Sequence, residues 1–197
     1  MDLVKAVREA DLSRSYLDFH ATGLNYACLH WSEGFVLKVY ELPCTKGEPI
    51  VAPHQHRYSF SQHVLCGAIL NCVYEETEPS SISPSFACVY DTPLNGGFGG
   101  WKPIRVASLM LVKTPRLYAG DSYILRSDEI HTIGAYENTW VFTVQGPDVN
   151  SNALTYFGSQ SVISTRNDLY RKPTSKDMKE MADRLEAALE AETKTSP

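Results

Sequence analysis

His54 and His56 are the residues whose type and spacing point most directly to chemistry. They stand two positions apart in Pro53-His54-Gln55-His56. On an extended strand residues i and i+2 point to the same side. Both imidazoles can therefore reach one point, at the roughly 2.0–2.1 Å that a bound transition metal requires. Such a pair also occurs by chance on many surfaces, so the prediction of a metal site depends on a third ligand. His131 is the candidate, since it closes a second polar segment far along the chain.

The segments around these histidines resemble the two sequence motifs of the cupin superfamily. The first family motif is Gly, five residues, His-x-His, three or four residues, Glu, six residues, Gly. The second is Gly, five residues, Pro-x-Gly, two residues, His. His54, His56 and Gly67 match the first motif, and Gly120 and His131 match the second. The resemblance covers roughly residues 47 to 157. It implies an all-β, single-domain cupin β-barrel, also called a jelly roll, with a divalent metal on His54, His56 and His131.

This chain departs from the family pattern at several positions. Phe60 stands where the family has its glutamate ligand, and Gly47 lies one residue farther from His54 than the motif asks. Arg126 and Asp128 replace the Pro and Gly of the second motif. The remaining three-histidine set resembles the thiol dioxygenase branch of the cupins, which implies Fe(II) as the favoured cofactor. Zinc, nickel, manganese and copper suit the same imidazole ligands.

Three residues after the histidine pair are candidates for catalysis. Arg57 could clamp a carboxylate with two hydrogen bonds, although its parity, opposite to that of the ligands, slightly favours an outward, solvated side chain. Tyr58 shares the parity of His56, and its phenol could donate a proton. Gln62 is expected to point inward and to reach the metal or its water. His63 is expected to point outward and to have a structural role.

The later strands supply candidates for binding a substrate. Tyr123 shares the parity of His131 and points inward if the loop between them keeps register. Trp140 and Phe142 share one face with Val144, and we expect that face to line the barrel interior. A small-molecule substrate is the expected ligand, because sites of this kind are mostly apolar with a few polar groups.

Short apolar runs rich in β-branched and aromatic residues must position these side chains, separated by Gly, Pro, Ser and Asn. The run 104–112 is apolar on nearly both faces, which predicts a central or covered strand. The Gly-rich stretch 91–102 is expected to be a loop, with Phe98 and Trp101 able to cover a site. The predicted strands are Asn25–Trp31, Phe35–Leu42, Gln62–Leu65, Ala68–Tyr74, Ser85–Tyr90, Ile104–Val112, Ser122–Leu125, Thr139–Gln145 and Ala153–Phe157.

Helical patterns are confined to the two ends of the chain. The first 20 residues read as a short helix, because apolar residues recur there at helical spacing. From Thr174 a longer helix is predicted, with Thr174 or Ser175 as its cap and Asp177 in its first turn. Its apolar stripe is expected to pack on the barrel or on a second subunit. We therefore divide the chain into an N-terminal helical extension (1–22), the barrel (23–160) and a C-terminal linker and helix (161–197).

Composition restricts the partners. A net charge of −5 without clustered Lys and Arg argues against nucleic acid. No apolar stretch approaches the roughly 20 residues of a membrane span, and no signal peptide is recognisable. We therefore expect no membrane association and a cytoplasmic location. The resemblance to the cupins, many of which pair through sheet edges, implies a homodimer. The five cysteines lack any C-x-x-C pair, which argues against disulfides and zinc-thiolate sites and favours reduced core residues.

These features favour a metal-dependent enzyme, foremost a non-haem iron dioxygenase acting on a small molecule such as a thiol. Two alternatives stay open. The same site could serve a metal-dependent isomerase, lyase or hydrolase, in which the ion acts as a Lewis acid. The barrel could also bind a small ligand without catalysis, because fold alone does not give function.

Overall fold

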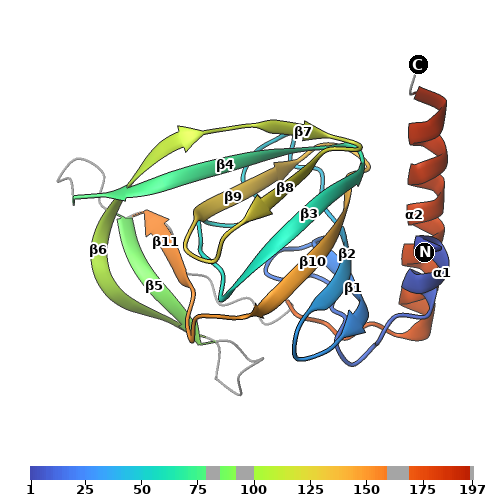
Figure 1. The fold of residues 1–197 in the computed structure, drawn as a ribbon, viewed down its shortest axis with the longest axis horizontal. Helices are drawn as coiled ribbons and strands as arrows, with labels where there is room; N and C mark the ends of the chain where they lie inside the picture. Colours follow the sequence, from blue (N-terminus) through green and yellow to red (C-terminus); the bar gives the residue numbers. More distant parts are fainter. Residues whose placement is uncertain (79–84, 92–99, 159–168, 196–197) are drawn as a thin grey trace.

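The computed structural model describes residues 1–78, 85–91, 100–158 and 169–195, in which strands predominate (Figure 1). Two helices, α1 (Leu3–Arg8) and α2 (Ser175–Thr195), flank them. The strands are β1 (Asn25–Trp31), β2 (Val36–Glu41), β3 (Tyr58–Cys66), β4 (Ala68–Thr77), β5 (Ser85–Asp91), β6 (Gly100–Lys113), β7 (Arg116–Tyr118), β8 (Ser122–Leu125), β9 (Ile130–Ala135), β10 (Trp140–Asp148) and β11 (Leu154–Gly158).

The strands form two antiparallel sheets. The first has the order β1-β2-β10-β3-β8, and the second has the order β11-β5-β6-β4-β7, with β9 also paired to β4. Neighbours in both sheets come from distant parts of the sequence, as in a jelly roll. The predicted all-β, cupin-type barrel is thus confirmed by the strand order. None of the helices in the described part of the chain is long and apolar enough to cross a membrane.

Side chains of the first sheet alternate between the barrel interior and the outer face. Along β3, Phe60, Gln62 and Val64 are buried, and the residues between them are half-buried. Cross-strand pairing places Gln62 opposite Thr143 of β10, and Thr143 opposite Lys38 of β2. Residues directly opposite one another share a face of the sheet. The register therefore builds interior rows, of which the central one is polar.

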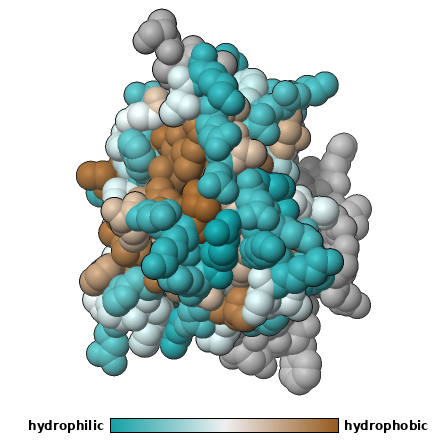
Figure 2. Space-filling model, turned by 90° about the vertical axis from the view of Figure 1, so that its right-hand side faces the viewer, coloured by the Kyte–Doolittle hydropathy of each residue, from teal (hydrophilic) through white to brown (hydrophobic). Residues whose placement is uncertain are grey.

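The two helices lie together on the outer face of this sheet (Figure 1). Met178, Met181 and Leu185 of α2 have no exposed surface and pack with Val7 of α1 and Ala27 of β1. The prediction that the apolar stripe packs on the barrel is confirmed. Seen from this side, hydrophilic side chains occupy the centre of the face, with an apolar area beside them (Figure 2).

The ends of the helices follow their local sequence. Thr174 and Asp177 cap α2 reciprocally: the Asp177 amide donates to Thr174 Oγ1 at 3.2 Å, and the Thr174 amide donates to Asp177 Oδ2 at 2.7 Å. At the other terminus the predicted 20-residue helix is too long, because α1 ends at Arg8. The chain beyond it makes irregular bridges, Tyr16 to Tyr26 and Leu17 to Arg171.

All the predicted strands are present, but two strands were not predicted and β3 begins earlier than expected. The unpredicted strands are β7, which is short, and β9, which contains Gly134. A Cβ on Gly134 would lie 2.1 Å from the Gly47 carbonyl oxygen. Glycine at this position therefore permits a close backbone approach. In the sequence alone, the same glycine indicates a break in a strand. The run 104–112 lies within β6, between β5 and β4 as expected, although Val106 and Met110 remain exposed.

Candidate metal centre

The three predicted ligands meet inside the barrel. His54 and His131 form a bridge between adjacent segments, with His54 N donating to His131 O at 2.8 Å and His131 N donating to His54 O at 3.0 Å. His56 lies two residues farther on, and both residues precede β3, so the pair is not on a regular strand, contrary to expectation. One potential ligand atom of each histidine lies within 4.8 Å of the others. The structure thus assembles the set from two segments 75 residues apart.

Hydrogen bonds determine which ring nitrogen faces the cluster. His131 Nδ1 lies 2.9 Å from the side-chain oxygen of buried Asn71, and His54 Nδ1 lies 2.9 Å from the carbonyl oxygen of Ala52. Both oxygens can only accept, so each Nδ1 carries the proton and each Nε2 keeps its lone pair. Such outer hydrogen bonds orient metal-binding imidazoles in proteins.

The distance between the ring nitrogens fits a shared ion. His56 Nε2 and His131 Nε2 lie 2.9 Å apart. Two nitrogens bound to one ion at about 2.0–2.1 Å and at right angles would be separated by about 3 Å. The residues present therefore fit a transition metal, and the three imidazoles would hold it.

The environment keeps the imidazoles neutral. Burial, reinforced by the neighbouring histidines, places the pKa of His56 and His131 well below the usual value. Burial also lowers the pKa of His54, although its hydrogen bond to Ala52 opposes this effect. A neutral imidazole is the form that binds a metal. The three imidazoles can therefore bind a cation at neutral pH.

Phe60 occupies the place of the missing carboxylate. Its ring centroid lies 4.8 Å from that of His56 and 6.1 Å from that of His131. Phe60 itself is buried. An apolar ring therefore stands against the cluster, and none of the described acidic residues joins the three histidines.

The candidates on β3 have different surroundings. The Tyr58 ring lies 5.5 Å from the His56 ring, and burial raises the pKa of its phenol to about 12. Gln62 is buried, as predicted; its amide donates to Thr143 Oγ1 at 3.1 Å, and its oxygen accepts from the Tyr123 hydroxyl. These contacts place Tyr58 beside the cluster and bind Gln62 into the polar row. Their catalytic roles stay predictions.

Arg57 and His63 point away from the cluster. The Arg57 guanidinium is paired with Asp148 at 3.5 Å and is 39% exposed. This arrangement matches the outward alternative and gives no support to a role as a clamp. His63 is half-buried and lies within 2.8 Å of Ser122 Oγ, consistent with the predicted structural role.

Of the three residues predicted to bind substrate, only Tyr123 faces the interior. It lies opposite Gln62 in the strand register. The expectation for Trp140 and Phe142 is wrong: both pack in the cluster formed with α1 and α2, outside the barrel. The reason is that α1 and α2 cover the outer face of β10, so its apolar side chains are buried there instead of in the barrel. The inward residues of β10 are Val141, Thr143 and Gln145.

Two functional candidates were missed at the sequence level. Asn71 orients His131, but nothing local to β4 distinguishes a buried asparagine from a turn residue. Lys38 of β2 is buried, with 8% of its surface exposed, and donates to Gln145 Oε1 at 2.8 Å. A single lysine inside the apolar run Val36-Leu37-Lys38-Val39-Tyr40 was the available signal.

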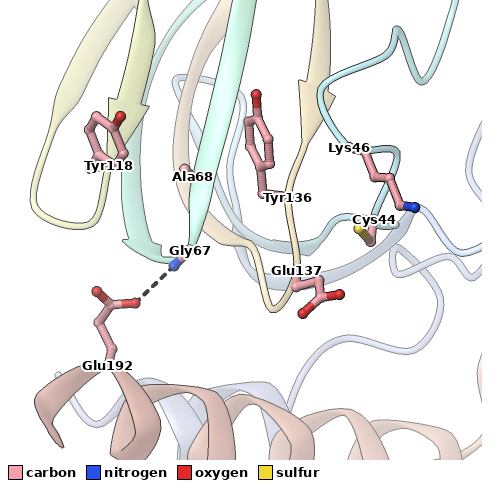
Figure 3. A pocket seen from close by; sticks show the side chains of 8 residues that line it. All are labelled: Cys44, Lys46, Gly67, Ala68, Tyr118, Tyr136, Glu137 and Glu192. Carbon is pink, nitrogen blue, oxygen red and sulfur yellow. Dashed lines mark hydrogen bonds between the residues drawn. The ribbon is translucent and has the colours of Figure 1, made fainter. Parts of the chain in front are cut away.

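A separate cleft lies at the other end of β3, where β3 turns into β4 (Figure 3). Its volume is about 470 Å³. Glu192 of α2 closes one side by accepting a hydrogen bond of 3.0 Å from the Gly67 amide. Within the described residues this cleft contains no cluster of three potential metal ligands. It is lined by Cys44, Lys46, Gly67, Ala68, Tyr118, Tyr136, Glu137 and Glu192.

Comparison with known proteins yields no matching family model and no matching curated protein sequence. Solved structures do match. An RmlC-like cupin from Shewanella frigidimarina is 14% identical with a TM-score of 0.41, covering 68% of this chain and 86% of that one. KdgF from Halomonas is 16% identical with a TM-score of 0.38, covering 64% and 81%.

A third similar structure is the DMSP lyase DddQ from Ruegeria pomeroyi. It is 15% identical with a TM-score of 0.39, and the match covers 73% of this chain and 57% of that one. The chain has a cupin-type jelly-roll fold with a three-histidine cluster inside it.

Proposed function

We propose that this protein is a metal-dependent enzyme acting on a small molecule, and that it is a non-haem iron dioxygenase. The observation that carries the proposal is the convergence of His54, His56 and His131, with the tautomers of His54 and His131 fixed so that Nε2 faces inward. Fe(II) held by these residues would supply redox chemistry towards dioxygen.

The protein side chains would determine how the substrate meets the metal. Phe60 keeps a carboxylate out of the cluster, so three neutral imidazoles leave the full positive charge of the ion for the substrate. Tyr58 retains its proton at neutral pH and lies beside His56, where its hydroxyl can donate to a substrate oxygen. Tyr123 and Gln62 form a fixed polar pair on the interior wall.

Metal analysis and oxygen uptake test this proposal. Purified protein should contain one transition metal per chain, and anaerobic loading with Fe(II) should give oxygen consumption with a member of a panel of small thiols and carboxylates. His131→Ala should lose both the metal and the activity, whereas His63→Ala, which alters a histidine outside the cluster, should keep both. Stoichiometric metal with no oxygen uptake across the panel would contradict the dioxygenase activity but not the proposal of a metal-dependent enzyme.

The second candidate is a metal-dependent isomerase, lyase or hydrolase on the same site. The observation that favours it is the chemistry of the ligands, because three neutral imidazoles suit zinc or nickel as well as iron. Zinc or nickel in the purified protein, with substrate turnover that does not depend on oxygen, would support this candidate. Failure to bind any metal would favour the non-catalytic alternative.

We also propose that the protein forms a homodimer. The support is an apolar surface on β6, where Val106, Met110 and Val112 are each 46–51% exposed. Exposed apolar patches often mark interaction surfaces. Sedimentation of the purified chain should give the mass of a dimer, and Met110→Glu should shift it to that of a monomer.

A further inference from the structure

The polar interior row of the first sheet contains a buried ammonium group. Lys38, Thr143, Gln62 and Tyr123 stand opposite one another across β2, β10, β3 and β8. Gln62 binds both Thr143 and Tyr123, so these three polar groups satisfy one another. Lys38 is the remaining member of the row.

The amino group of Lys38 has few partners for its charge. Within the described residues it donates one hydrogen bond, to Gln145 Oε1 at 2.8 Å, and an ammonium group has three donors. It lies 4.8 Å from the centroid of the Tyr26 ring and 5.8 Å from that of Tyr58. Among the described residues no carboxylate forms an ion pair with it. Two acidic groups act on it: Cys28, a thiol whose pKa is raised by burial, and Asp148, which is paired with Arg57.

A buried cation without a counterion is costly, and natural proteins normally pair it. Burial lowers the pKa of Lys38 to about 8, so the group still carries its charge at pH 7. The contacts with Gln145 and the two tyrosine rings hold the amino group in place without neutralising it. An anion entering the barrel would supply the missing partner.

Lys38 is also close to the metal centre. The Tyr58 ring is near both, with its centroid 5.8 Å from Lys38 Nζ and 5.5 Å from the His56 ring centroid. Phe60, which contacts His56 and His131, belongs to the next interior row. Gln145 stands opposite Phe60 in that row and accepts the hydrogen bond from Lys38. Lys38 thus lies on the same interior wall as the residues around the histidines, one row away.

We propose that Lys38 binds the anionic group, a carboxylate, of the small molecule that the three-histidine site acts on. This assignment rests on the proposed small-molecule site, and it names the substrate class as organic acids. Lys38 takes the role that the sequence suggested for Arg57, whose guanidinium is committed to Asp148.

The test uses acetate and inorganic phosphate as probes of protein stripped of metal with phenanthroline and then dialysed. Binding is followed by amide chemical shifts at pH 7, at constant ionic strength. Acetate should bind near Lys38, and Lys38→Met should weaken it about tenfold or more, because a charge-assisted hydrogen bond is lost. Lys38→Arg should retain part of the affinity, and Lys176→Met, at an exposed position on α2, should retain all of it.

Several outcomes would overturn the assignment. Equal acetate affinity in Lys38→Met and wild type, or no acetate binding by the wild type, contradicts it, and phosphate binding in preference to acetate contradicts the carboxylate class. If Lys38→Met is more stable than the wild type and its acetate-induced amide shifts are unchanged, Lys38 has a structural role and does not bind the anion. Because the probes are applied without metal, a failed metal titration contradicts the proposed function and leaves this result interpretable by itself.

Discussion

His131 Nδ1 and Asn71 Oδ1 lie 2.9 Å apart, and this hydrogen bond between β9 and β4 fixes which nitrogen of His131 faces the other two histidines. Asn71 is 4% exposed and His131 is 3% exposed, so water does not replace the contact. Residues that orient a metal-binding imidazole contribute to affinity without touching the ion. Asn71 is therefore a positioning residue for the site.

Replacing Asn71 by Leu should weaken metal binding about 10–100-fold, because the Nδ1 proton of His131 loses its acceptor. Isothermal titration with Zn²⁺ or Co²⁺ measures the effect. Asn71→Asp keeps an acceptor and should restore most of the affinity, and Asn150→Ala, at an exposed position, should be neutral. Equal affinity of Asn71→Leu and wild type would show that the hydrogen bond does not position His131.

Phe60→Glu should convert the cluster into one with a carboxylate ligand. Metal-free Phe60→Glu should be less stable than the wild type by about 3–5 kcal/mol, because a packed ring is lost and a carboxyl group is buried. Added Mn²⁺ or Zn²⁺ should raise its Tm more than it raises that of the wild type. The introduced carboxylate adds a fourth protein ligand and so strengthens metal binding to the folded state. Calorimetry with and without metal measures both effects.

Phe60→Leu is the matched control for that substitution. It removes the ring without adding a ligand, so its metal-dependent rise in Tm should equal that of the wild type. If Phe60→Glu and Phe60→Leu respond equally to metal, the position does not face the ion.

Lys38 should make stability depend on pH above neutrality. Its folded pKa of about 8 lies below the usual lysine value of 10.5, so the unfolded state binds more protons between these values. The free energy of unfolding therefore rises with pH in this window. Between about pH 7.5 and 9.5 the contribution of Lys38 amounts to about 2 kcal/mol, from 1.36 kcal/mol per pKa unit.

Urea unfolding of wild type and Lys38→Met at several pH values isolates this contribution. Buried cysteines and tyrosines have raised pKa values, which makes stability fall with rising pH in both proteins. The difference between the two proteins removes that common trend. A difference that stays constant from neutral pH to about 9.5 would rule out a depressed pKa for Lys38.

The contact between α2 and the barrel should contribute stability without affecting the metal site. Leu185 has no exposed surface and packs in the cluster that includes Trp140. Leu185→Ala should lower the free energy of unfolding by about 2–5 kcal/mol. Glu186→Ala, its exposed neighbour on the helix, should be nearly neutral. Metal stoichiometry should be unchanged in both folded variants, and a loss of metal in folded Leu185→Ala would contradict the separation of the two layers.

The turn between β3 and β4 should require glycine at position 67. Gly67 has φ of +72°, and an added Cβ would lie 2.8 Å from Thr139 Cα. Gly67→Ala should therefore be destabilising by more than about 1 kcal/mol, because backbone strain and a steric clash add. Gly34→Ala is the control, since nothing lies within 4 Å of its added Cβ. Thermal unfolding of the two variants should separate them clearly.

The sequence by itself determined the features that depend on local spacing. The alternation along β3 that turns Gln62 inward and the apolar stripe of α2 follow from the periods of strands and helices. The two-residue spacing of His54 and His56 indicated that they act together, although both precede β3. The position of Phe60 in the motif likewise indicated a site without the usual carboxylate. Each of these features needs only the geometry of one element.

Tertiary structure decided the features that depend on what covers each face. The face of β10 that carries Trp140 and Phe142 is the more apolar one, so alternation alone suggested that this face lines the interior; α1 and α2 cover it instead. β9 escaped prediction because Gly134 is required by the approach of Gly47, a contact distant in sequence. Asn71 and Lys38 acquire their roles only from the strands paired beside them. A polar residue in a strand becomes part of a site through its neighbours in space, which local sequence does not specify.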